Sequence, residues 1–306
     1  MTLLVRDFLP ADAEAWVRVR RAALPYMVTT AEGVLGDLAS AHPDRRLRLL
    51  VAEQDGELIG TAQVGIAHES PKPGQGFCNP YVRPDRVGRG AGSLLLRRGE
   101  EHLADAGATE VYSWVLDEPS NRAFAEKRGY APRRAAHFLR LDLANGQLPP
   151  LPDLPAGVGL LSGADFEDDP RPLFEADAEV TADEPSDVTA EFGDYEDWLA
   201  TTWRRPGFDR ALTTVVTVDG QVAAFSAAET DGRTRYWSAM TGTRRAYRGR
   251  GLAKLAKCDS LHRSRAAGFT DAYTGNDAGN GPMLAVNRWF GYEVCATEVR
   301  HVRSLG

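Results

Sequence analysis

The stretch Tyr247-Arg248-Gly249-Arg250-Gly251-Leu252-Ala253 decides the fold, because it joins a segment typical of a strand to one typical of a helix. The preceding segment, residues 236–243, is short and contains aromatic and β-branched residues, as a buried strand does. Apolar residues then recur every three positions, as on one face of a helix: Leu252, Leu255, Cys258 and Leu261. The Arg/Gly run therefore predicts a strand-to-helix turn.

Such a turn is suited to binding a pyrophosphate. Glycine lets the backbone approach a ligand closely, and the first N–H groups of a helix are unpaired and lie at the positive end of its dipole. The run matches neither G-x-x-x-x-G-K-[ST] nor G-x-G-x-x-G, because it continues Leu252-Ala253-Lys254. A plain Arg/Gly surface turn is the alternative.

Composition bounds the class of protein. The chain has 306 residues and a net charge of −7, which predicts about two domains and argues against a nucleic-acid partner. No apolar run reaches the ~18 residues of a membrane span, and the N-terminus does not resemble a signal peptide. The three cysteines are widely spaced and the histidines form no ligand pair, so we expect a cytoplasmic protein with no membrane partner and no metal.

The order of predicted elements repeats. In the first half we expect strands at 3–8, 47–53, 58–66, 76–82, 110–115 and 138–143, with helices at 11–26, 91–106 and 120–128. An Asp-Gly hairpin signal at Asp55-Gly56 recurs at Asp219-Gly220. Gly249 follows Gly88 by 161 residues, and Gly251 follows Gly90 by the same number. This register predicts two α/β domains in tandem rather than one continuous α/β domain.

With Arg-x-x-Gly-x-Ala at 248–253 and its counterpart at 87–92, both halves resemble domains of the GNAT superfamily of N-acetyltransferases. The plan is similar to that of the tandem mycothiol synthases. The resemblance implies an α/β fold of two tandem GNAT domains, each a mostly antiparallel, splayed sheet flanked by helices. We expect an N-terminal domain at 1–144, a linker at 145–155 and a C-terminal domain at 156–306.

The resemblance also implies acetyl-coenzyme A as cosubstrate and assigns residues to it. In the C-terminal half the pyrophosphate would lie on the 248–253 turn, and the pantetheine would contact the neighbouring strands; the residues are Arg248, Gly249, Arg250, Gly251, Leu252, Ala253, Thr241, Thr243, Asn276 and Asn280. In the N-terminal half the matching residues are Gly88, Arg89, Gly90, Ala91, Gly92 and Asn121. Val87 departs from the usual Arg or Gln, so the C-terminal half is expected to be catalytic and the N-terminal half degenerate or regulatory.

The resemblance implies direct transfer in a ternary complex, with a general acid and a general base. The tyrosine that the family often places four residues before the closing glycine is absent, since Ala125 and Asn287 stand there. The candidates are Glu229 as base, and Asn287 and Tyr292 near the leaving group. An acyl-coenzyme A-binding protein without turnover is the alternative.

The acceptor implied by the resemblance is a small-molecule primary amine. Residues 165–197 contain fourteen acids and one base, Arg171, at the place where such domains wall the acceptor site. An acidic wall would attract a cationic amine, and a solvated acidic face is the alternative. We expect a monomer or a homodimer.

Overall fold

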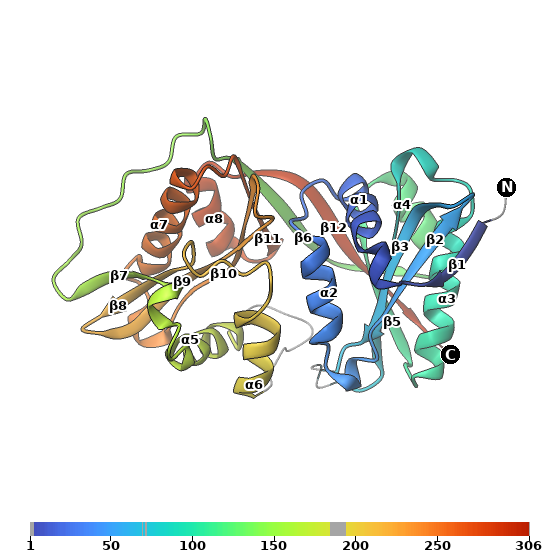
Figure 1. Ribbon diagram of the computed structural model, residues 1–306, viewed down its shortest axis with the longest axis horizontal. Coiled ribbons are helices and arrows are strands. Elements are labelled where there is room, and N and C mark those ends of the chain that lie inside the picture. The colour runs from blue at the N-terminus through green and yellow to red at the C-terminus, as the bar shows by residue number, and fades with distance from the viewer. Residues whose placement is uncertain (1–2, 69, 71, 184–193, 306) are drawn as a thin grey trace. The chain divides into compact units, whose positions relative to one another are not determined.

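The computed structural model describes residues 3–68, 70, 72–183 and 194–305, and it divides into two compact units (Figure 1). Unit 1 consists of Met1–Ala136 and Ala296–Gly306, and unit 2 consists of His137–Cys295. Within the described part of the chain, no helix combines the length and the apolar character that a bilayer crossing requires.

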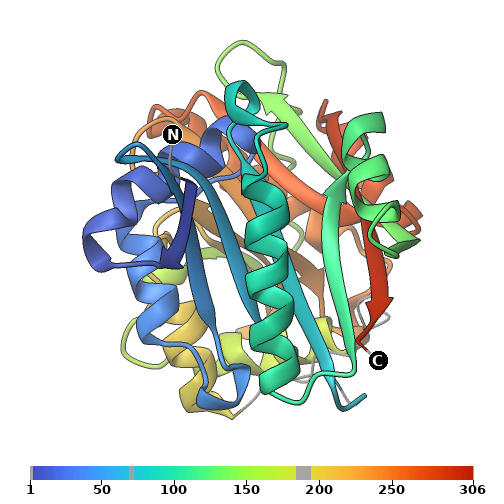
Figure 2. The same cartoon turned by 90° about the vertical axis from the view of Figure 1, so that its right-hand side faces the viewer.

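Unit 1 is built around a mixed sheet with strand order β1-β2-β3-β4-β5-β12. Neighbouring strands are antiparallel except β4 and β5, which are parallel. The bounds are β1 Leu3–Asp7, β2 Arg48–Gln54, β3 Glu57–Ile66, β4 Gln75–Val82, β5 Glu110–Leu116 and β12 Glu293–Ser304, with α1 Ala13–Ala23, α2 Ala31–Ala39, α3 Ala91–Asp105 and α4 Pro119–Glu126. Figure 2 shows α3 lying across this sheet and the red β12 beside the green β5.

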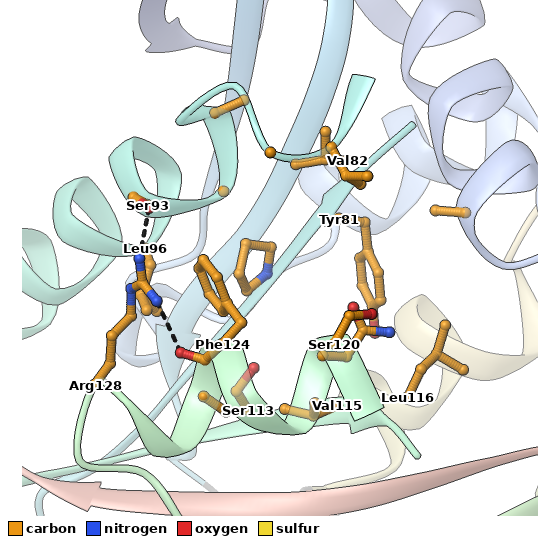
Figure 3. Close-up of a pocket in the computed structure, with 18 of the residues that line it drawn as sticks. Tyr81, Val82, Ser93, Leu96, Ser113, Val115, Leu116, Ser120, Phe124 and Arg128 are labelled. Carbon is orange, nitrogen blue, oxygen red and sulfur yellow. Dashed lines mark hydrogen bonds between the residues drawn. The ribbon is translucent and has the colours of Figure 1, made fainter. Parts of the chain in front are cut away.

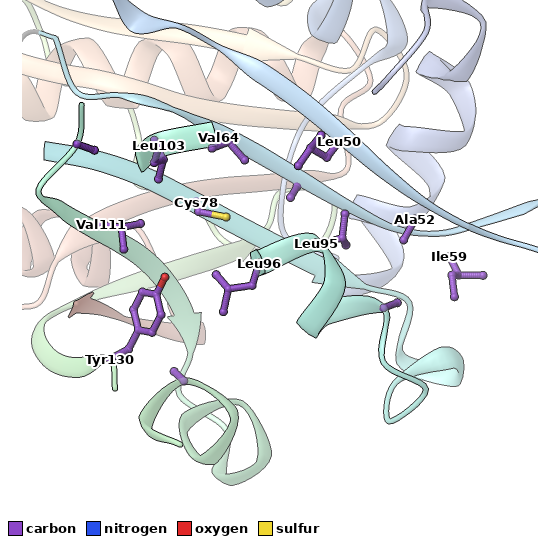
Figure 4. Packing of buried hydrophobic residues seen from close by; sticks show 14 residues of the cluster. Leu50, Ala52, Ile59, Val64, Cys78, Leu95, Leu96, Leu103, Val111 and Tyr130 are labelled. Atoms are coloured by element: carbon purple, nitrogen blue, oxygen red, sulfur yellow. The ribbon is translucent and has the colours of Figure 1, made fainter. Parts of the chain in front are cut away.

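The alternation of side chains along the strands gives unit 1 two cores. On β2, Leu50 and Ala52 belong to the cluster around α3, whereas Leu49 and Val51 belong to the cluster around α1 and α2. Figure 4 shows the cluster around α3. Gly99 permits the close approach of α3 to β4, because a Cβ there would lie 2.4 Å from Cys78 Sγ. This contact holds α3 close against β4.

Unit 2 repeats the plan with strand order β6-β11-β10-β9-β8-β7, in which β10 and β11 are parallel. The helix α7 packs on β8, β9 and β10, as α3 packs on the sheet of unit 1. The bounds are β6 Ala131–Asp142, β7 Val158–Ser162, β8 Thr214–Val218, β9 Gln221–Thr230, β10 Arg235–Thr243 and β11 Asp271–Asp277, with α5 Arg171–Thr181, α6 Tyr195–Trp198, α7 Leu252–Ala266 and α8 Gly281–Trp289.

The last strands do not follow the order of the sequence. The strand beside β5 in unit 1 is β12, paired from Glu298↔Leu116 to Ser304↔Glu110. The strand beside β11 in unit 2 is β6, which comes from the first half of the chain. The unit boundaries at 136/137 and 295/296 therefore differ from the predicted boundaries at 144 and 156. Hydrophobic alternation identifies a strand but does not say which sheet it joins.

Most predicted elements are present within a few residues. Both Asp-Gly turns have positive φ at each central residue, namely 52° and 83° at Asp55 and Gly56, and 49° and 79° at Asp219 and Gly220. This is the geometry of a two-residue hairpin of type I′. The helix α2 was not predicted, and β6 begins at Ala131, seven residues before its expected start at 138.

Candidate functional site

A gap opens between β4 and β5 in unit 1. The parallel register covers Gln75–Phe77 against Glu110–Tyr112 and then ends. Beyond it, Asn79 Oδ1 accepts a hydrogen bond from the Trp114 N–H at 2.9 Å, so a side chain takes the place of a strand neighbour. Pro80 follows on β4 at a point where no N–H is needed for pairing with β5. Main-chain groups at the carboxyl ends of both strands are thus available to a ligand.

A cavity of about 790 Å³ occupies this gap (Figure 3). Its walls are β4, β5, α4 and the turn that leads into α3. Five of the six residues predicted for the N-terminal cofactor site line it: Gly88, Gly90, Ala91, Gly92 and Asn121. A cavity of this size lies in the usual range for small-molecule sites, roughly 300–1,000 Å³.

The turn that precedes α3 presents its backbone to this cavity. Gly88 and Gly90 have φ of 79° and 92°, values that side chains rarely adopt. A Cβ at Gly88 would have no described atom within 4 Å, so the backbone there is open to a ligand. Within the described residues, no side-chain hydrogen bond caps α3. The N–H groups at the start of α3 and the helix dipole would favour an anion at this turn.

Arg128 joins the two helices that border the cavity. Its guanidinium donates to Ser93 Oγ on α3 at 2.6 Å and to the Phe124 carbonyl on α4 at 2.8 Å (Figure 3). It also lies 3.7 Å above the centre of the Phe124 ring. A fixed positive charge therefore stands on the cavity wall near the turn.

A buried carboxyl group lies beside the cavity on the face of the sheet that carries α1. Glu298, on β12, accepts hydrogen bonds from the hydroxyls of Tyr81 at 3.3 Å and Tyr26 at 3.4 Å. Burial raises the pKa of Glu298 to about 7, opposed by these bonds and by Arg20. Sequence reasoning missed this residue because its strand was assigned to the other half. The one sequence signal for a strand at Glu298 was the alternation of this polar residue with the apolar Val299.

The turn at 248–253 in unit 2 has nearly the same backbone. Gly249 and Gly251 both have φ of 76°, and Arg248 has φ −64° and ψ 161° against −65° and 161° at Val87. Two arginines at its start, Arg245 and Arg248, however, form ion pairs with Asp183. Asp183 accepts from Arg248 at 2.5 Å and from Arg245 at 2.7 Å, and these arginines lower the pKa of Asp183 to about 2. The turn thus already carries an anion on its arginines.

Five other residues predicted for the unit 2 site, Thr241, Thr243, Leu252, Asn276 and Asn280, have structural contacts. Thr241 Oγ1 bonds Ser226 Oγ at 3.0 Å, the Thr243 carbonyl accepts from Arg248, and Leu252 is buried in a core. Asn280 caps α8 by accepting from the Met283 N–H, and Asn276 accepts from Asn287. Thr274 Oγ1 donates to the Ser238 carbonyl at 3.0 Å, which bridges β11 and β10 just past their paired residues.

The three predicted catalytic residues are paired with other side chains or buried. Glu229 accepts from Arg205 at 2.7 Å. Asn287 is fully buried and accepts from Lys257 Nζ at 2.5 Å. Tyr292 is buried, its hydroxyl has no hydrogen-bond partner among the described residues, and burial raises its pKa. None of these three lines the cavity of unit 1.

Several acids of the stretch predicted to wall the acceptor site have partners within the protein. Asp165 caps a turn, Asp177 accepts from Trp198 Nε1, and Glu179 pairs with Arg244. Residues 184–193 of the stretch lie outside the described residues. Among residues 3–68, 70, 72–183 and 194–305, no group of three His, Cys, Asp or Glu side chains is placed to hold a metal.

Sequence comparisons identify relatives of the chain. A profile of the Acetyltransferase (GNAT) family matches residues 13–130, which lie in unit 1. Mycothiol acetyltransferase of Nocardia farcinica (strain IFM 10152) is 37% identical over 123 residues, covering 40% of this chain and 38% of that protein. Aminoglycoside N(6′)-acetyltransferase type 1 of Stenotrophomonas maltophilia is 32% identical over 114 residues, covering 36% of this chain and 72% of that protein. The match thus spans about two-fifths of the mycothiol enzyme's length.

Solved structures share the fold over the full length. A GCN5-related N-acetyltransferase from Sphaerobacter thermophilus aligns with a TM-score of 0.73 at 24% identity, covering 99% of this chain and 95% of that one. A tandem GNAT protein from the clavulanic acid biosynthesis pathway aligns with a TM-score of 0.76 at 20% identity, covering 100% and 99%. The predicted tandem fold is confirmed.

Proposed function

The chain belongs to the GNAT family of acetyltransferases, and from this premise we propose that it transfers the acetyl group of acetyl-coenzyme A to a primary amine of a small molecule. The named relatives support an amine acceptor, since one is an aminoglycoside N-acetyltransferase. The transfer is direct, within a ternary complex of enzyme, thioester and amine.

The observation that carries the proposal is the cavity of unit 1 and the turn at its mouth. The pyrophosphate would lie on the N–H groups of the 88–92 turn, where Gly88 and Gly90 leave the backbone open. The pantetheine arm would enter the gap beyond Phe77, where the carboxyl ends of β4 and β5 have main-chain groups without each other as partners. We therefore assign the acyl donor to unit 1, in contrast to the unit 2 site that the sequence favours.

The polar groups on the cavity wall support this assignment. Asn121 and Ser120, at the start of α4, line the cavity and would contact the arm of the donor. Arg128 adds positive charge between α3 and α4. Arg89 extends from the same turn but does not line the cavity.

A binding protein without turnover is the second candidate, because Ala125 lines the cavity where the family often has tyrosine. Release of free thiol from acetyl-coenzyme A separates the two. We expect release with at least one member of a panel of polyamines, aminoglycosides and amino acid amides. Tight binding of acetyl-coenzyme A with no release across the panel would favour the binding protein.

A matched pair of substitutions tests the assignment to unit 1. Gly92→Leu fills the cavity from α3, where a Cβ would lie 3.5 Å from Phe124 and the backbone is helical. Ala253→Leu makes the same change at the equivalent position of α7. We expect Gly92→Leu to reduce turnover at least tenfold and Ala253→Leu to leave it near the wild-type value. The reverse result would place the donor in unit 2.

A further inference from the structure

Of the cluster of Tyr26, Tyr81 and Glu298, only Tyr81 is among the residues that line the cavity. Glu298 is 5% exposed, and its Oε1 receives both hydroxyls at 3.3–3.4 Å. Tyr81 is also packed against Arg20, whose guanidinium lies 4.8 Å above its ring centre. A hydrogen-bonded carboxyl group that is buried beside a cavity is a candidate for a functional residue.

The cluster lies at the carboxyl ends of β4 and β5, at the edge of the cavity. Tyr81, near the end of β4, and Leu116, at the end of β5, both line the cavity. Glu298 is paired in register with Leu116, which places the carboxyl group next to that wall. Figure 3 shows Tyr81 and Leu116 among the side chains around the cavity.

The two faces of the sheet separate this cluster from the turn. Cys78 and Val82 on β4 pack in the core around α3, whereas Tyr81 carries Arg20 of α1 over its ring. A chain that starts at the N-terminus of α3 and passes through the gap would therefore present its far end to Tyr81. That end is the thioester, and the acceptor amine must meet it there.

We infer that Glu298 is the proton acceptor for the amine, acting through the hydroxyl of Tyr81, and that β12 delivers it to unit 1 from the other end of the chain. This inference rests on the proposed function. Tyr81 is the group that would touch the amine, and Glu298 positions Tyr81 and receives its proton.

The proton transfer balances without a further reagent. The amine nitrogen attacks the thioester carbon and forms the C–N bond, while the carbonyl π electrons move to oxygen. One N–H proton passes to the Tyr81 oxygen as the Tyr81 proton passes to Glu298 Oε1. The C=O bond re-forms, the C–S bond breaks and its electron pair leaves with sulfur. The proton held on Glu298 is then returned through Tyr81 to the thiolate.

The electrostatics suit a proton acceptor near neutral pH. The groups that face Glu298 are Tyr81 on β4, and Arg20 and Tyr26 from α1 and the segment after it. Burial raises the pKa of Glu298 to about 7, and it raises the pKa of Tyr81 as well, so the tyrosine stays protonated and serves as a bridge. The carboxylate form, which accepts the proton, predominates above about pH 7.

The test compares the pH dependence of kcat/KM in the wild type and in Glu298→Gln. In the wild type, kcat/KM should rise with pH through an ionisation near 7, in addition to that of the amine. Glu298→Gln should lower kcat about 100-fold, within the range typical of general-base loss, and should remove the ionisation near 7. Its Kd for coenzyme A should equal the wild-type value. Tyr81→Phe, which removes only the hydroxyl, should give the same loss.

Two further variants sharpen the result. Glu100→Gln changes another carboxyl group of unit 1, which accepts from Tyr130 and Arg303, and should keep the wild-type pH profile. Glu229→Gln tests the base expected in unit 2 and should also keep it. The inference is overturned if Glu298→Gln retains the ionisation near 7, whether or not kcat falls, or if Tyr81→Phe is as active as the wild type. Absence of turnover in the wild type with coenzyme A bound would instead refute the proposed function.

Discussion

The turns at 87–92 and 248–253 have almost the same backbone conformation but differ in what lies next to them. Val87 and Arg248 agree within a degree in φ and share ψ of 161°. The first turn borders a cavity of about 790 Å³, whereas the arginines of the second are held by Asp183. Unit 2 matches the Arg-x-x-Gly-x-Ala motif more fully than unit 1 does. It is thus the unit in which a carboxylate of the protein, Asp183, already pairs with Arg245 and Arg248.

This difference shows what the motif does and does not determine. Glycine at the two positions of positive φ sets the backbone, and that is retained in both units. The arginine at the first position of the motif adds a positive charge, and an acidic residue from another part of the chain can neutralise that charge. The bridges between the strands beyond their paired ends come from residues far from the turn, Asn79 in unit 1 and Thr274 in unit 2.

The exchange of last strands provides the prediction with the largest effect. Deleting residues 296–306 removes the partner of β5, so unit 1 should unfold although the deletion follows unit 2 in the sequence. Stability of a domain is about 5–15 kcal/mol, and a strand inside a sheet contributes a large share of it. Hydrogen exchange should show loss of protection in Glu110–Leu116 and retained protection in Thr214–Val218.

The opposite outcome would be loss of protection in Thr214–Val218 with Glu110–Leu116 unaffected. That pattern would mean that the chain forms two consecutive domains, as the sequence alone predicts.

Each unit also contains a buried titratable group whose shifted pKa makes stability depend on pH, Lys257 in unit 2 and Glu298 in unit 1. Lys257 in unit 2 is fully buried, and burial lowers its pKa from 10.5 to about 7. Between these values the unfolded chain binds more protons than the folded one, so stability rises with pH by up to about 5 kcal/mol. This rise should be absent in Lys257→Met. Chemical denaturation at pH 7 and at pH 10 measures it as the difference between the two proteins.

Glu298 in unit 1 should show the reverse slope. Its pKa is raised from 4.5 to about 7, so the folded state binds more protons in that window and stability falls with rising pH by about 3 kcal/mol. Glu298→Gln should remove the fall between pH 4.5 and 7. Equal slopes in the wild type and the variant would mean that the carboxyl group is solvated in solution.

The sequence predicts features that depend on local residues and does not predict those that depend on tertiary contacts. The repeat of Gly88 and Gly249, and of the Asp-Gly hairpins, identified the tandem fold because turn geometry is local. Glu298 could not be found, since its role depends on a strand pairing over 180 residues away in the sequence. Glu229 could be proposed from its place at a strand end, but its ion pair with Arg205 depends on tertiary packing. The ion pair between Arg248 and Asp183 likewise joins residues far apart in the sequence.

The smallest expected effect concerns the one residue by which the turns differ most. Val87 is 61% exposed and its backbone matches that of Arg248, so Val87→Arg should fold normally. An added exposed charge near a pyrophosphate contributes about 0.2–1 kcal/mol, which corresponds to a gain in coenzyme A affinity of about 1.4-fold to fivefold. Arg248→Val should leave the affinity unchanged. A large loss with Arg248→Val would indicate that unit 2 binds the donor.

Titration of coenzyme A by calorimetry into Gly90→Asp and Gly251→Asp tests the central claim most directly. Both substitutions place a carboxylate at a glycine of positive φ at the N-terminus of a helix, so their effects on the backbone are matched. The account predicts that Gly90→Asp weakens binding tenfold or more, because a like charge at the pyrophosphate costs at least ~1.4 kcal/mol, and that Gly251→Asp binds as the wild type does. Wild-type affinity in Gly90→Asp with binding lost in Gly251→Asp would contradict it.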